Sequence, residues 1–200
     1  MAGQVNPDSA FGNSIIELAS ESDFTSFLDV GTWNGQGTTR CLYDAVGKRK
    51  GVHIYSVESN AAMYEVAVAF WAPCPPSLHL LYGTLSKGGL TEAEIRAHPL
   101  FSDVKVHFNL HYEQDCKDLE AAPIVELPAR IDMVILDGGE FCGAADFRRA
   151  ALLNPKVIAL DDIRVMKNKE NYERLLADSE WELVARGKDR NGWAIFRRAS

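Results

Sequence analysis

The sequence predicts an α/β protein with a doubly wound, Rossmann-like sheet that ends in an antiparallel hairpin. Apolar runs of strand length alternate with helical patterns along the chain, which is typical of this fold class. Three of the runs are almost continuously apolar, as expected of parallel strands that helices cover on both faces. The last two runs are separated only by residues 187–192, which is too short for a parallel crossover and therefore predicts a hairpin.

Seven segments have strand character, and helical patterns fill most of the intervals between them. The almost continuously apolar strands are residues 26–30, 131–137 and 157–161, and the others are 52–58, 78–82, 181–186 and 193–197. The helical patterns cover residues 14–20, 38–46, 61–70, 144–153 and 167–178. We expect a single domain over residues 1–200, because a chain of this length can bury a core of its own.

The segment at about residues 71–130 is the irregular part of the chain. It contains several prolines and a polar stretch, and we interpret it as an insertion on the substrate side. Thr91 and Glu94 have the spacing of a capping box, which predicts the start of a helix. We expect His107 and His111 to be a partly exposed pair, with substrate contact as the alternative.

The overall composition is that of an ordinary soluble globular protein, with 46% hydrophobic and 24% charged residues. The net charge of −7 argues against a surface that binds nucleic acid. We find no signal peptide and no apolar window long enough to span a membrane, so we expect no membrane partner. None of the four cysteines forms a C-x-x-C pair, which favours reduced thiols and a cytoplasmic protein.

A glycine-rich loop follows the first predicted strand, with the spacing Asp29-x-Gly31-x-x-x-Gly35-x-x-Thr38. A dinucleotide loop would need glycine where Trp33 stands, and a Walker A motif is also absent. The loop therefore suits close approach of a ligand without a diphosphate. Asp29 can accept a hydrogen bond from an ammonium group, and the helix that begins at Thr38 suits a carboxylate. Together these groups match an amino-acid moiety.

Glu58 ends the second predicted strand, 27 residues after Gly31. A carboxylate at this position of a Rossmann-like fold commonly accepts hydrogen bonds from both hydroxyls of a ribose. The alternative is a solvated carboxylate at a strand end. An amino acid and a ribose in one site correspond to S-adenosylmethionine (SAM).

Residues 28–35 together with Glu58 resemble the first two motifs of class I SAM-dependent methyltransferases. This resemblance covers nearly the whole chain and implies the strand order 3-2-1-4-5-7-6, with SAM as the cofactor. It also implies that Thr32, Trp33 and Thr84 contact the cofactor, the last of them on the adenine side. Trp33 has an alternative interpretation, in which it packs against the first helix of the fold.

Four carboxylates lie at or just after the carboxyl ends of the fourth and fifth predicted strands, namely Asp137, Glu140, Asp161 and Asp162. Neighbouring parallel strands deliver their carboxyl ends to the same crevice, so we expect three carboxylates to converge beside the cofactor. Unpaired carboxylates repel one another, and a cation would remove that repulsion. Ligands that are all oxygen favour Mg²⁺, Ca²⁺ or Mn²⁺.

The same carboxylates resemble the metal site of catechol-type and macrolide- or sugar-type O-methyltransferases. The resemblance places Asp137, Asp161 and Asp162 at the metal-ligand positions and makes Asp137 a catalytic and cofactor contact. Glu140 replaces the lysine of the catechol-type enzymes, and Gly139 replaces the carboxylate of the sugar-type enzymes. Glu140 can be a fourth ligand, the general base, or the cap of the next helix. A metal-free site is the alternative for the whole group.

The function expected from these features is methyl transfer from SAM to an acceptor hydroxyl, aided by a divalent cation. The acceptor would be a small molecule or a glycoside. The alternatives are a metal-independent methyltransferase, a SAM-binding protein without activity, and an NAD-binding Rossmann protein. The missing G-x-G-x-x-G motif and the terminal hairpin count against the last of these. The sequence leaves the oligomeric state open, with a homodimer as one option.

Overall fold

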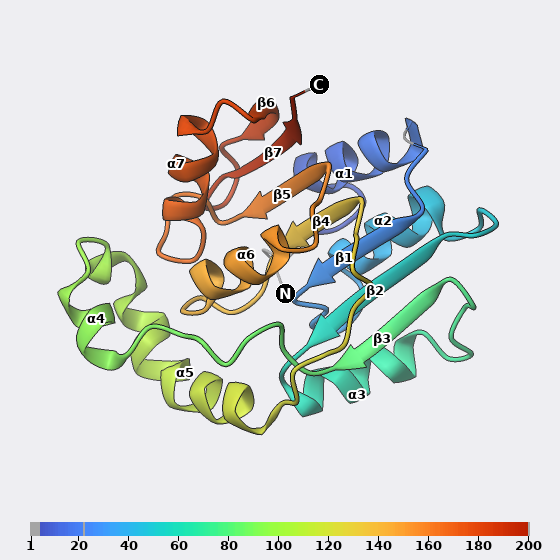
Figure 1. Ribbon diagram of the computed structural model, residues 1–200. Helices are drawn as coiled ribbons and strands as arrows, with labels where there is room; N and C mark the ends of the chain where they lie inside the picture. Colours follow the sequence, from blue (N-terminus) through green and yellow to red (C-terminus); the bar gives the residue numbers. More distant parts are fainter. Residues whose placement is uncertain (1–4, 22, 200) are drawn as a thin grey trace.

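The computed structural model describes residues 5–21 and 23–199, and its centre is a seven-stranded sheet. The strand order is β3-β2-β1-β4-β5-β7-β6, as the sequence predicts (Figure 1). Strands β3, β2, β1, β4 and β5 pair in parallel, and β7 pairs antiparallel with both β5 and β6, so six strands share one direction. The strands are β1 (Ser26–Val30), β2 (His53–Glu58), β3 (Leu78–Tyr82), β4 (Met133–Leu136), β5 (Val157–Asp161), β6 (Trp181–Gly187) and β7 (Trp193–Arg198).

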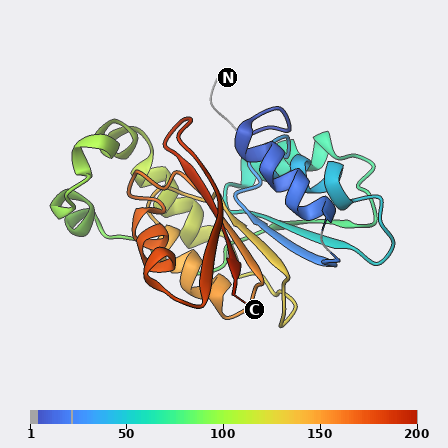
Figure 2. The same ribbon diagram turned by 90° about the horizontal axis from the view of Figure 1, so that it is seen from above.

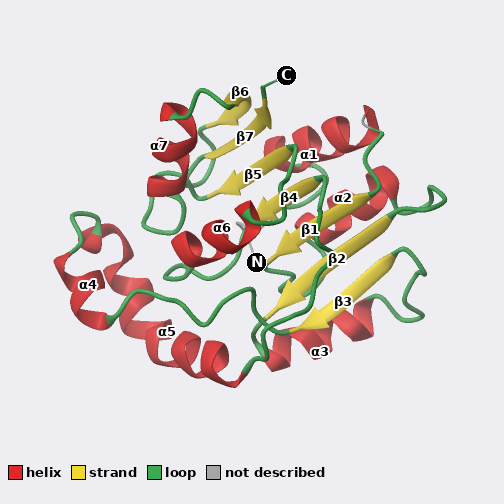
Figure 3. Cartoon of the chain, viewed as in Figure 1, coloured by secondary structure: helices red, strands yellow, loops and turns green. Residues whose placement is uncertain are grey.

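Helices lie on both faces of the twisted sheet (Figures 2 and 3). Residues of α1 and α2 pack in one apolar cluster with Trp71, which follows α3, and residues of α6 and α7 pack in another on the opposite face. The helices are α1 (Ala10–Glu21), α2 (Thr38–Val46), α3 (Ala61–Phe70), α4 (Glu92–Ala97), α5 (Phe101–Ala121), α6 (Gly143–Ala151) and α7 (Lys169–Ala177).

Strand β4 shows why the central strands are apolar throughout. Met133 and Ile135 pack toward α1 and α2, whereas Val134 and Leu136 pack toward α6 and α7. Successive side chains of a strand point to opposite faces, so a strand that is covered twice has no position for a solvated residue. The predicted β1, β3 and β5 and the predicted α2 and α3 have the observed boundaries.

The segment at 71–130 is more regular than its sequence indicates. It contains β3 as well as α4 and α5, and α4 and α5 lie beyond the carboxyl ends of the strands (Figure 1). Thr91 and Glu94 form the predicted capping box at the start of α4. The long helix α5 is not predicted from the sequence, because only Val104 and Phe108 in it are buried and its apolar periodicity is weak.

The cysteines and the helix lengths bear on the expectations about disulfides and membrane spans. All four cysteines are free thiols, two of them buried and two exposed. No helix within residues 5–21 and 23–199 is both long enough and apolar enough to cross a membrane.

The contribution of the apolar core to stability can be tested by replacing a buried and an exposed leucine with alanine. Leu42 in α2 is fully buried, whereas Leu110 in α5 is 69% exposed. We expect Leu42→Ala to lower the free energy of unfolding by about 2–5 kcal/mol and Leu110→Ala by less than about 0.5 kcal/mol. Urea denaturation measures both values, and an equal loss in the two variants would contradict this assignment of the core.

Candidate functional site

A cavity of about 440 Å³ lies at the carboxyl ends of the parallel strands. Its walls come from the loop after β1, the end of β2, helix α5, the segment after β4, and the loop of the terminal hairpin. Doubly wound sheets bind their ligands at this edge, outside the carboxyl ends of the strands. The predicted site residues in its wall are Gly31, Thr32, Trp33, Thr38, Glu58, Thr84, Asp137, Glu140 and Asp162.

Gly31 allows the loop after β1 to lie directly against the end of β4. Its φ is +102°, and a Cβ there would lie 2.2 Å from the carbonyl oxygen of Asp137. Only glycine fits such an approach of two backbones. Thr32 shares a hydrogen bond of 2.6 Å with the hydroxyl of Ser56, which fixes the loop to β2. The loop therefore presents its backbone, as well as the half-exposed ring of Trp33, to the cavity.

Gly35, a predicted cofactor contact, is not among the residues that line the cavity. Its carbonyl oxygen accepts a 3.0 Å hydrogen bond from Nε1 of Trp71, which follows α3. A Cβ on Gly35 would lie 2.6 Å from that nitrogen. The second glycine of the loop is thus required by the packing of an indole ring, and its contact with a cofactor stays a prediction.

Asp29 is fully buried within β1 and also lies outside the cavity wall. Its carboxylate accepts hydrogen bonds from the hydroxyls of Thr38 at 2.7 Å, Thr39 at 2.6 Å and Ser56 at 3.3 Å. Burial raises the pKa of Asp29 to about 7, although these hydroxyls oppose the shift. Asp29 therefore fixes the start of α2 to the sheet through this internal network, and its bond to a ligand ammonium group stays a prediction.

Glu58 lines the cavity from the end of β2, as predicted. Its two carboxylate oxygens accept hydrogen bonds from the backbone N–H groups of Trp33 at 2.6 Å and Asn60 at 2.8 Å. Burial raises the pKa of Glu58, and these N–H donors oppose the shift. Each carboxylate oxygen has a second lone pair, so the fixed side chain can still accept hydroxyl groups of a ligand. Thr84 also lines the cavity, and its hydroxyl donates to the carbonyl of Ser86 at 2.8 Å.

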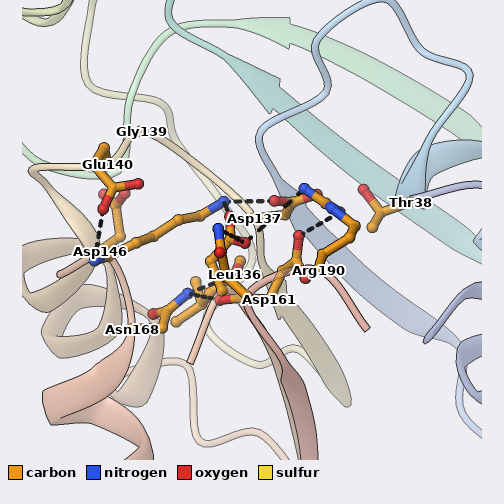
Figure 4. A network of polar contacts seen from close by, with 12 residues as sticks. Thr38, Leu136, Asp137, Gly139, Glu140, Asp146, Asp161, Asn168 and Arg190 are labelled. Atoms are coloured by element: carbon orange, nitrogen blue, oxygen red, sulfur yellow. Dashed lines mark hydrogen bonds and ion pairs between the residues drawn. The ribbon is translucent and has the colours of Figure 1, made fainter. Parts of the chain in front are cut away.

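Asp137, Asp161 and Asp162 converge as predicted, with one oxygen from each within 4.8 Å of the others. Asp137 follows β4 and Asp161 ends β5 (Figure 4). Asp162 is the next residue along the chain. Asp162 has a φ of +57°, an uncommon conformation for a residue with a side chain. Such conformations persist where the surrounding structure holds them, and they are frequent at functional sites.

The cation among these carboxylates is the ammonium group of Lys167. Its Nζ lies 2.6 Å from Oδ1 of Asp137 and 3.1 Å from Oδ2 of Asp162. Burial alone would lower the pKa of Lys167, but Asp137, Asp162 and Asp161 together raise it well above its usual value. Lys167 therefore stays charged and joins the ends of β4 and β5.

Arg190, in the loop of the terminal hairpin, supplies a second cation. Its guanidinium lies 2.9 Å from Oδ2 of Asp161 and 4.0 Å from Oδ1 of Asp162. Asn191 donates to the same oxygen of Asp162 at 3.0 Å. In Asp162 burial raises the pKa, but Lys167 outweighs that effect and the net shift is downward. Each member of the predicted metal site is thus paired with a cation of the chain itself.

Glu140 lines the cavity at the other end of this network from Arg190 (Figure 4). One of its oxygens accepts a hydrogen bond of 3.3 Å from the backbone N–H of Lys167. The residue that caps α6 is Cys142, which makes no side-chain cap bond. Burial raises the pKa of Glu140, and Lys167 opposes the shift.

Helix α5, which the sequence pattern does not predict, forms one wall of the cavity. Its lining residues include His107, Tyr112, Asp115, Cys116 and Asp118, whereas the neighbouring His111 is not part of the wall. His107 lies 3.5 Å from Asp115, whose hydrogen bond raises the pKa of the imidazole. The side chain of Asp118 accepts a hydrogen bond of 2.7 Å from Asn60, next to Glu58. The helix therefore closes the cavity opposite the sheet.

Lys167 and Arg190 were also missed, although the sequence holds a signal for each. Lys167 stands at the start of a predicted helix. A cation there is unfavourable beside the positive end of the helix dipole, so a nearby anion is expected to compensate it. Arg190 lies in the hairpin loop, which must return beside the carboxyl end of β5 because β7 runs antiparallel to β5. Both positions could have been assigned to the carboxylate group on these grounds.

The burial of Asp29 predicts a specific dependence of stability on pH. The pKa of Asp29 is about 7 in the folded chain and 3.8 in the unfolded reference, so the unfolded chain releases this proton first as pH rises. The contribution of Asp29 to stability is therefore complete below about pH 4 and is lost by about pH 7, with a total near 4 kcal/mol. Denaturation of the wild type and Asp29→Asn across this range measures the difference between them, which should decrease as pH rises.

The exposed Asp23 provides the control for this experiment. Asp23→Asn removes a carboxylate of the same kind and should follow the wild-type curve. A constant difference between the wild type and Asp29→Asn over this pH range would contradict the assignment.

Comparisons with known proteins agree with the fold. No family model and no curated protein matches this chain. An O-methyltransferase from Bacillus cereus in complex with SAH matches with a TM-score of 0.64 and 15% identity, over 100% of this chain and 84% of that one. A methyltransferase from Geobacter sulfurreducens matches with a TM-score of 0.62 and 14% identity, over 96% and 80% of the two chains.

A SAH-bound methyltransferase from Podospora anserina is similar as well, with a TM-score of 0.58 and 13% identity, over 94% of this chain and 78% of that one. At such identities the likeness concerns the fold. The seven strands, their order and the terminal hairpin of this chain are therefore those of the Rossmann-like methyltransferase fold, as the resemblance of the loop and Glu58 predicted.

Proposed function

We propose that this protein binds SAM in the cavity and transfers its methyl group to an acceptor hydroxyl of a small molecule or a glycoside. The observation that carries the proposal is the position of Glu58, whose carboxylate is fixed at the cavity wall beside the glycine loop. The fold supports it, because two of the similar structures named above were solved with bound SAH, the product of methyl transfer from SAM.

The ribose of SAM would bind to Glu58, and its amino-acid end would lie along the glycine loop. Thr38 lines the cavity at the start of α2, where backbone N–H groups favour a carboxylate. Because Asp29 does not reach the cavity, we assign the ammonium group of SAM to Asp137, which lies against Gly31. Thr84 would contribute to the wall on the adenine side.

The acceptor would enter between the sheet edge and α5, where Glu140 lines the cavity. The acceptor oxygen forms a bond to the methyl carbon while the bond from that carbon to sulfur breaks, and the electron pair of the broken bond remains on sulfur. SAH leaves, and the hydroxyl proton passes to a base. We assign the base to Glu140, whose carboxylate is near the end of the network and accepts only the long backbone hydrogen bond from Lys167 among the contacts of the described residues.

A divalent cation was expected to assist this reaction, and Asp137, Asp161 and Asp162 are the residues that would hold it. Their surroundings do not fit such an ion, because Lys167 and Arg190 already pair with all three carboxylates. The transfer proposed here therefore contains no step on a metal. Positioning of the two reactants and proton removal are the contributions that we assign to the chain.

Calorimetry with SAH tests the cofactor assignment. The wild type should bind SAH, and Glu58→Gln should bind it at least about tenfold more weakly, because the amide oxygen and NH₂ cannot replace two carboxylate acceptors. Glu182→Gln is the matched control on an exposed strand position and should bind as the wild type does. Absence of binding at millimolar SAH would refute the proposal, and a positive titration with NAD instead would favour the oxidoreductase alternative.

Transfer of a labelled methyl group separates an enzyme from a protein that only binds SAM. The wild type should label at least one member of a panel of phenols, sugars and glycosides, and Glu140→Gln should reduce the rate by about 10²–10⁴-fold while SAH affinity is retained. Unchanged turnover in Glu140→Gln would remove the base assignment. SAH binding without transfer to any member of the panel would favour the non-catalytic alternative.

A further inference from the structure

We propose that Lys167 occupies the place of a divalent cation among Asp137, Asp161 and Asp162, so that this site operates with an internal cation and does not bind a metal ion. The geometry of the carboxylate group carries this inference independently of the reaction. Its consequence for catalysis rests on the proposed function.

The charges of the site support an internal cation. Three carboxylates gather within 4.8 Å, and two cationic side chains, Lys167 and Arg190, contact them. The side chain of Lys167 is only 7% exposed, so water screens these charges weakly. A divalent ion entering the group would meet the positive charge of Lys167 at short range. It could bind only if the ammonium left its two partners, and a buried charge separated from its partners is unstable.

The backbone around Lys167 cannot easily carry the side chain away. The carbonyl oxygen of Lys167 lies so close to Gly143, at the start of α6, that a Cβ on Gly143 would be 1.8 Å from it. The next residue, Asn168, donates from its amide group to the carbonyl of Leu136 at 3.0 Å and to that of Asp161 at 2.8 Å. These contacts fix the segment to the ends of β4 and β5. The position of the ammonium is therefore set by the sheet itself.

An ammonium in this place can do part of what a metal ion would do. It carries three N–H donors, and two of them are directed to Asp137 and Asp162. Lys167 is part of the cavity wall, so its third donor can hold an acceptor oxygen while that oxygen loses its proton. Positive charge beside a developing oxyanion stabilises it, as donors do in an oxyanion hole. We therefore infer that Lys167 positions the acceptor oxygen.

Binding of Mn²⁺ tests the inference, because the spin resonance signal of free Mn²⁺ reports its concentration directly. The wild type should leave the signal unchanged up to about 1 mM Mn²⁺, whereas Lys167→Met should bind the ion at least about tenfold more tightly than the wild type. Adding Asp137→Asn to Lys167→Met should abolish that gain. Lys169→Met is the matched control, since Lys169 is partly exposed and pairs with Glu173 on its own helix.

The wild-type titration decides the outcome even if Lys167→Met does not fold. Mn²⁺ binding to the wild type that is lost in Asp137→Asn would overturn the inference, because the ion would then displace Lys167. Lys167→Gln is a second variant of the same kind, which keeps a hydrogen-bond donor and removes the charge. For folded variants, circular dichroism should show a rise of the melting temperature with Mn²⁺, and the wild type should show none.

Turnover provides a separate test that depends on the proposed function. If the wild type transfers methyl groups, EDTA should leave the rate unchanged, and Lys167→Met should lose most of its turnover and recover part of it with Mn²⁺. Loss of wild-type turnover in EDTA, restored by Mg²⁺, would overturn the inference but leave the proposed function intact. If no transfer is detected with any acceptor, the Mn²⁺ titration still decides between the internal cation and a metal.

Discussion

The ion pairs of Lys167 with Asp137 and Asp162 are the interaction on which this edge of the sheet depends. Asp137 follows β4 and Asp162 follows β5, and the two strands are parallel neighbours whose ends would repel each other if both carboxylates were buried without a partner. Removing the ammonium would leave uncompensated carboxylate charges in a site that water hardly reaches. The free-energy cost of this change exceeds the net stabilisation that the intact ion pair provides. The positions of Asn168 and Gly143 then follow, because both hold the segment that carries Lys167 against the strand ends.

The cofactor side of the cavity is held in a different way. There, hydroxyl and backbone N–H groups satisfy buried carboxylates, with Asp29 fixing the start of α2 and Glu58 fixing Trp33. Hydrogen bonds to a carboxylate are directional and leave a lone pair available on Glu58, so the same group can serve both the loop and a ligand. The cavity therefore has one wall whose carboxylates are held by hydroxyl and N–H donors, and another whose carboxylates are held by cations. That division suits the proposed reaction, in which SAM is held in place while an acceptor hydroxyl loses its proton.

Much of the fold follows from periodicity, but the two halves of the site were not equally predictable. The apolar runs of β1, β4 and β5 identify doubly covered strands, and Glu58 is found at a position that any Rossmann-like sheet directs to its ligand. Helix α5 was missed because a helix that forms one wall of a cavity and faces water elsewhere needs few apolar residues. The internal hydrogen bonds of Asp29 were not predicted either, since the spacing of a motif does not say which neighbouring hydroxyl groups will donate to a carboxylate.

The cluster of Asp137, Asp161 and Asp162 also shows what a local sequence pattern does not predict. The sequence correctly places three aspartates at adjacent strand ends, and the need for a cation follows from their charge alone. Whether that cation is an ion from solution or a side chain depends on the chain that surrounds the strand ends, which is not local in sequence. Here Lys167 precedes α7 and Arg190 comes from a hairpin that returns beside β5, so two different connections deliver the compensating charge. A cluster of acidic strand ends is therefore evidence for a metal only after the cations at helix starts and in returning loops have been placed.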